Sequence, residues 1–267
     1  MKKRSALFRL AAFTAAVLCS LLPFFGSYAG EPDEAITQEI VLDDETADEP
    51  ENPARAAFID DIIALGEKLY KKANGKLQRA QYKEDIYICK NFTVYIFRQT
   101  RGKYRMAEYP DVQLKIPDNL PSAQCKPYYY GYCWKDVPAE EGNPFVVAGQ
   151  FLYDTDLSYE ENLERAVELM RGVRRGDYFQ MTADYSHGQG AHSAIMIADW
   201  DPETDTIRWM DSNMAGKKVN GVRYGMVQFN AEESAEWWAK AFCVKKRGAT
   251  IYRLRDDIIF KDSISGQ

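Results

Sequence analysis

Residues 177–211 read DYFQMTADYSHGQGAHSAIMIADWDPETDTIRWMD. Three apolar segments in this stretch predict β-strands at Asp177–Thr182, His192–Trp200 and Ile207–Asp211. The polar segment Asp201–Asp205 contains a proline and predicts the turn between the second strand and the third. Because short turns join antiparallel neighbours, these residues predict part of a mostly antiparallel sheet.

The residues before this stretch predict mainly helices. Apolar residues at helical spacing predict one helix over 54–73, which Asn74-Gly75 ends. A second helix is expected to start at or just after Cys89 and to stop before Arg101-Gly102. Residues from about 102 to 158 are rich in proline and have no sustained period, so they are interpreted as an insertion with short strands.

A third helix and several strands complete the expected domain. Ser158 is followed three residues later by Glu161, a capping-box pattern that opens a helix over Tyr159–Met170. Helices that precede a mostly antiparallel sheet indicate an α+β fold. The other predicted elements are strands at Pro144–Tyr153, Arg223–Phe229 and Ala249–Leu254 and a helix at Glu232–Phe242.

The N-terminal residues predict export. Residues 1–29 combine basic residues, an apolar run and Ser27-Tyr28-Ala29, which is the pattern of a cleaved signal peptide. The run is short for a membrane span, so we expect no stable membrane insertion after cleavage. Residues 30–53 hold ten carboxylates and no Lys or Arg, which indicates a disordered acidic leader. The domain is therefore expected over 54–267.

Charge and cysteine content exclude several classes of function. The expected domain has 30 basic and 30 acidic residues, and nothing in that balance favours nucleic-acid binding. The whole chain has two histidines and no CxxC pair, so we expect neither a structural metal ion nor another cofactor. Cys125 and Cys133 could form a disulfide in an oxidising compartment.

Four polar residues predict a nucleophilic site. Cys89 stands at the expected start of a helix, where the positive end of the helix dipole favours a thiolate. A second device that lowers a thiol pKa is an imidazole, and His192 opens a strand, whereas His187 lies in a glycine-flanked loop. Asp211 and Asn213 share one face of the next strand, and either could orient the imidazole.

These residues resemble a known superfamily. Residues 88–97 (ICKNFTVYIF) resemble the Asp-Cys-Ser-Gly-Phe helix of NlpC-type cell-wall peptidases. Arg175–Phe179 resembles their Pro-Gly-Asp-Leu-Val strand, and His192–Ile197 is similar to their His-Val-Gly-Ile-Tyr-Ile. Asp211-Ser212-Asn213 resembles the Glu-x-Asn of the sister CHAP family (cysteine, histidine-dependent amidohydrolases/peptidases). The resemblance implies a papain-like fold, in which N-terminal helices pack on a mostly antiparallel sheet.

The sequence departs from the family pattern in two places. Ile88 replaces the usual Asp before the cysteine, and Lys90-Asn91 replaces Ser-Gly. The segment between the cysteine helix and the Gly-Asp strand is also long. In NlpC-type enzymes an upstream Tyr often assists the oxyanion hole, and Tyr82 and Tyr87 are the candidates for that role.

The resemblance implies a secreted or cell-envelope monomer that cleaves an amide or peptide bond, with peptidoglycan or a peptide as the substrate. Three alternatives remain open. Transglutaminase-like enzymes also use Cys, His and Asp in that order, and Trp209-Met210-Asp211 resembles their strand. A catalytically inactive cell-wall binding module and a secreted effector on the same fold are the other two.

Overall fold

The computed structural model describes residues 52–76, 78–80, 89–116, 138–181, 192–219, 222–244 and 246–266. The expected signal peptide and nearly all of the acidic leader lie outside these residues. No helix in the described parts of the chain is long and apolar enough to cross a membrane.

Seven antiparallel strands form the main sheet, in the order β1-β7-β6-β5-β4-β8-β3. Two further strands, β2 and β9, pair in a small second sheet. The strands are β1 (Gln78–Ala80), β2 (Tyr104–Met106), β3 (Phe145–Phe151), β4 (Tyr178–Met181), β5 (His192–Met196), β6 (Thr206–Val219), β7 (Val222–Ser234), β8 (Ala249–Leu254) and β9 (Ile258–Phe260).

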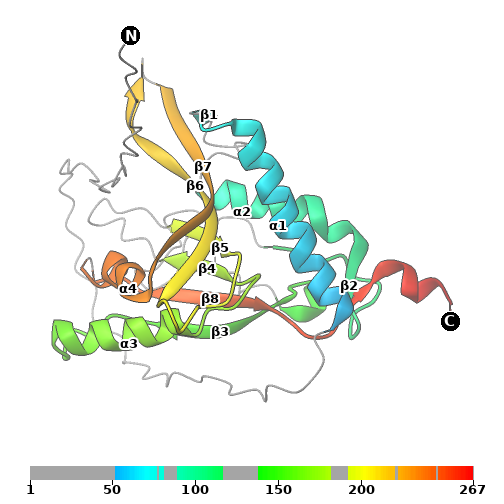
Figure 1. The fold of residues 1–267 in the computed structure, drawn as a ribbon. Coiled ribbons are helices and arrows are strands. Elements are labelled where there is room, and N and C mark those ends of the chain that lie inside the picture. The colour runs from blue at the N-terminus through cyan, green and yellow to red at the C-terminus, as the bar shows by residue number, and fades with distance from the viewer. Residues whose placement is uncertain are drawn as a thin grey trace, which may run out of the picture.

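Helices cover both faces of the main sheet, and Figure 1 shows α1 and α2 on one side and α3 and α4 on the other. The α-helices are α1 (Pro53–Ala73), α2 (Cys89–Thr100), α3 (Tyr159–Arg171) and α4 (Ala235–Cys243), and the 3₁₀ turns are η1 (Arg101–Lys103), η4 (Ala139–Glu141) and η6 (Lys261–Gly266). The prediction of an α+β fold is therefore confirmed.

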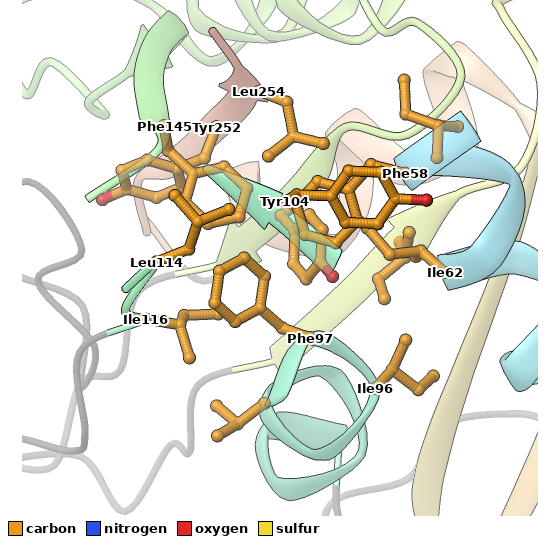
Figure 2. Packing of buried hydrophobic residues seen from close by; sticks show 14 of the residues in the cluster. Phe58, Ile62, Ile96, Phe97, Tyr104, Leu114, Ile116, Phe145, Tyr252 and Leu254 are labelled. Carbon is orange, nitrogen blue, oxygen red and sulfur yellow. The ribbon is translucent and has the colours of Figure 1, made fainter. Parts of the chain in front are cut away.

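The sheet separates two hydrophobic cores, because neighbouring strand residues face opposite sides. On β4, Tyr178 belongs to the core under α1 and α2, and Phe179 to the core under α3 and α4. Figure 2 shows the first core, in which the ring of Phe58 stacks on Tyr104 at a centroid distance of 4.3 Å. Phe97 lies between Phe58 and Phe145, which fixes α2 on the sheet.

Local signals place the helix ends where the sequence predicts them. The Asn52 side chain accepts hydrogen bonds from the first N–H groups of α1, and Asn74 ends the helix in the left-handed conformation. Ser158 and Glu161 form the predicted capping box at α3. The helices predicted over 54–73 and from Cys89 are confirmed.

Several elements differ in extent from the sequence-based expectation. The strand predicted over Ile207–Asp211 runs from Thr206 to Val219 as β6, and the one predicted over Arg223–Phe229 runs from Val222 to Ser234 as β7. The helix predicted from Glu232 begins three residues later, because Ser234 ends β7 and its side chain accepts the N–H of Trp237. The strand predicted to reach Trp200 ends at Met196. Beyond the strand, the Trp200 N–H donates to the carbonyl of Val173, which is not part of the sheet. Within the expected insertion, β3 is the edge strand of the main sheet.

Candidate active site

The first turn of α2 carries Cys89 to the sheet. Phe92, Ile96 and Phe97 are fully buried and anchor this helix in the first core. The N–H groups of a first helical turn have no acceptor within the helix and carry a partial positive charge. The backbone N–H groups of Lys90 and Ser193 both donate to the Cys89 sulfur.

Cys89, His192 and Asp211 form a continuous hydrogen-bonded chain. His192 is the first residue of β5, and its ring bonds the Cys89 sulfur on one side. On the other side its Nε2 lies 2.9 Å from Oδ2 of Asp211, on the adjacent strand β6. The His192 and Asp211 side chains are only 14% and 4% exposed, so water screens these charges weakly.

The charges of these hydrogen-bonded residues stabilise one another. Burial by itself raises the pKa of Cys89, but the hydrogen bond and charge of His192, with the two backbone N–H groups, lower it below the ordinary 9.0. Burial by itself lowers the pKa of His192, but the hydrogen bonds that its ring donates to Asp211 and Cys89, with the charges of those two groups, outweigh it and raise the pKa to about 10. Both shifts favour the thiolate–imidazolium pair, which is the reactive form of a cysteine nucleophile.

Three of the four predicted site residues thus come together. Asn213 lies two residues beyond Asp211 on β6, opposite Met226 of β7, and is half-buried. The carboxylate that reaches the imidazole is that of Asp211. Tyr82, Tyr87, His187 and the Cys125–Cys133 pair lie outside the described residues.

The Gly-Asp motif that supports the family resemblance forms a structural cluster. Asp177 is fully buried, and both its oxygens accept hydrogen bonds from Arg253 of β8, at 2.9 and 2.8 Å. The N–H of Arg174 donates to the same carboxylate. Gly176 has a φ of 88°, and a Cβ there would lie 2.6 Å from the side chain of Ile59 in α1. The motif therefore holds the start of β4 against α1 and β8.

Residues that sequence reasoning did not assign to the site surround His192 and Asp211. Trp209 Nε1 lies 3.3 Å from Oδ2 of Asp211, and the ring of Trp238 lies over His192 at 6.3 Å with an angle of 26°. Gln180 donates to the Ser193 hydroxyl at 2.8 Å, beside the N–H that meets the sulfur. The spacing Trp209-x-Asp211 puts both side chains on one strand face, which is the signal that could have found Trp209.

The described residues contain no group of three His, Cys, Asp or Glu side chains that could hold a metal ion. No family model, curated protein or solved structure matches the chain. The interpretation of the site therefore depends on its own geometry and chemistry.

Proposed function

We propose that this protein is a secreted cysteine hydrolase with a papain-like arrangement of the NlpC/CHAP type. The observation that carries the proposal is the chain Cys89–His192–Asp211, which begins at a helix N-terminus. A nucleophile, a base and a group that orients the base are the recurring parts of acyl-transfer sites. Their order along the chain also fits the family resemblance of residues 88–97, 192–197 and 211–213.

The reaction would proceed in two acyl-transfer steps. The Cys89 thiolate attacks an amide carbonyl carbon, and N–H groups at the start of α2 stabilise the oxyanion. The His192 imidazolium then gives its proton to the leaving amine, and the C–N bond breaks to leave a thioester. Neutral His192 next takes a proton from water, which attacks the thioester. Collapse releases the carboxylic acid and restores the thiolate and the imidazolium.

Export and the family resemblance favour a peptide or amide bond of peptidoglycan as the substrate. The test is digestion of purified peptidoglycan with the mature chain, followed by mass spectrometry of the products. New amine ends within the stem peptides identify an endopeptidase, and free lactyl groups identify an amidase. Cys89→Ala is expected to abolish release, and Cys243→Ala is the matched control that retains it. Absence of any release from the wild type would instead favour the binding or effector alternatives.

Alkylation tests the nucleophile without a substrate. Cys243 is buried too, but burial raises its pKa to about 11, so it serves as a reference thiol in the same molecule. Cys89 is expected to react with iodoacetamide at pH 6 to 7 far faster than free cysteine, and His192→Ala is expected to remove that advantage. The hydrolase proposal fails if Cys89 in the folded protein reacts no faster than free cysteine.

A further inference from the structure

The carboxylate of Asp211 has an unusual set of partners. Two donors, His192 Nε2 and Trp209 Nε1, both meet its Oδ2, at 2.9 and 3.3 Å. Oδ1 is buried, and no hydrogen-bond partner for it lies among the described residues. A carboxylate has about four acceptor positions, so among the described residues Asp211 is held through one oxygen only. His192 is the group to be oriented, which leaves the Trp209 N–H as the independent restraint.

A second indole restrains the imidazole. Trp238 of α4 is 3% exposed, lies roughly parallel to the His192 ring, and meets Trp209 edge to face at 4.9 Å and 78°. Phe179 of β4 packs against Trp238 at 4.8 Å. Each indole therefore restricts the movement of the other. Trp238 contacts His192 and Trp209 contacts Asp211, so each indole contacts a different member of the candidate triad. An aromatic face beside an imidazolium also favours the positive charge.

We propose that Trp209 and Trp238 are positioning residues, which hold the Asp211 carboxylate and the His192 ring in the alignment that the Cys89 nucleophile requires. The inference rests on the proposed function, since the positioning of these side chains matters only if Cys89, His192 and Asp211 carry out a reaction. The charged groups that act on the imidazole are Asp211 and Cys89. From β4 and α4 the neighbours are Met181 and Trp238, neither of which titrates.

A neighbouring indole provides a matched control. Trp237 is adjacent to Trp238 on α4 and stacks on Trp209 at 5.9 Å and 21°, but it is 40% exposed. The indole contacts described for His192 and Asp211 come from Trp238 and Trp209, not from Trp237. If the tryptophans only fill the second core, Trp237→Phe and Trp209→Phe should differ in stability alone. If they position the triad, only Trp209→Phe should change how His192 binds its proton.

The test is a pH titration of the histidine rings by NMR in the mature chain. The chain contains only two histidines, so His187→Gln identifies the His192 signal. The wild-type midpoint is expected near 10. Trp209→Phe keeps an aromatic ring but loses the N–H, and is expected to lower the midpoint by about one pH unit, a tenfold loss of proton affinity. Trp237→Phe is expected to leave it unchanged.

Trp238→Phe is the second variant and is decisive if Trp209→Phe does not fold. It trims the ring over His192 and is expected to lower the midpoint by a few tenths of a pH unit. An unchanged midpoint in the folded Trp209→Phe or Trp238→Phe protein overturns the inference, as does an equal shift in Trp237→Phe. The proposed function fails separately, when wild-type His192 titrates high but the protein releases nothing from peptidoglycan.

Discussion

Two buried carboxylates of the main sheet, one just before β4 and one on β6, have different surroundings. Asp177, just before the strand, accepts from both nitrogens of the Arg253 fork and from a backbone N–H. Asp211 of β6 bonds His192 of β5, the strand residue that pairs with Met181 at the end of β4, and its Oδ1 has no partner among the described residues. A fully satisfied cluster stabilises a fold, whereas a partly satisfied one keeps a charge available for chemistry.

The largest expected effect comes from breaking the satisfied cluster. Arg253→Met leaves Asp177 as a buried charge without its partner and is expected to lower the free energy of unfolding by about 3–5 kcal/mol. Urea denaturation measures the change. The double variant Asp177→Leu with Arg253→Met removes both charges and should recover most of the loss. A cost below about 1 kcal/mol in the single variant would show that the pair is not structural.

The matching change at Asp211 should affect the reactivity of Cys89 more than the stability of the fold. Asp211→Asn keeps the shape of the side chain but removes the charge that raises the pKa of His192. We expect a loss of about 1–3 kcal/mol in unfolding free energy, because a buried imidazolium loses its charged acceptor, and a roughly tenfold slower alkylation of Cys89 at pH 6. Asp177→Asn is the control, because it should destabilise the protein while leaving the pH profile of alkylation unchanged. If Asp211→Asn and Asp177→Asn gave the same pH profile of alkylation, the proposed difference between the two clusters would be wrong.

The pH dependence of stability separates the two members of the ion pair. His192 has a pKa raised to about 10, so its contribution is complete below the ordinary 6.5 and is lost as pH rises through 10. Cys89 has a lowered pKa, so its contribution is complete above the ordinary 9.0 and is lost as pH falls through the lowered value. At a pH above both 6.5 and the lowered pKa of Cys89, and below 9.0, the folded and unfolded pairs bind the same number of protons, and the two trends cancel.

Cys89→Ser removes one side of this balance. In the wild type the Cys89 trend opposes the His192 trend as pH rises, whereas in Cys89→Ser the His192 trend alone remains, with a pKa that is less raised because the hydrogen bond and charge of Cys89 are lost. The unfolding free energy of Cys89→Ser, relative to the wild type, should therefore fall by up to about 1.4 kcal/mol per pH unit as pH rises. Urea denaturation at pH 7, 8 and 9 measures the difference between the two proteins. Parallel curves would mean that Cys89 and His192 do not form an ion pair in the folded state.

Much of the fold, and the residues of the candidate triad, could be predicted because their signals are local. The helix ends follow from caps such as Asn74 and Ser158, and the strand pattern places His192 and Asp211 on neighbouring strands. The choice between Asp211 and Asn213 could not be made, because both share one face and only the three-dimensional distance to the imidazole separates them. The place of Trp238 over His192 depends on how α4 packs on the sheet, which no local pattern encodes.

The smallest expected effect concerns a bulge in β7 beside Asp211. Trp209 pairs with Ala231 and Asp211 with Gln228, so β7 contains one extra residue there, and Asn230 has a φ of 56°. Asn230→Gly removes the steric cost of the left-handed conformation and is expected to leave stability unchanged or raise it by about 0.5 kcal/mol, whereas Asn230→Val should lower it by about 1–2 kcal/mol. Thermal unfolding measures both. Since bulges re-aim strand residues near active sites, Asn230→Val should also slow Cys89 alkylation at pH 6, an effect that no change in the Asp177 cluster should produce.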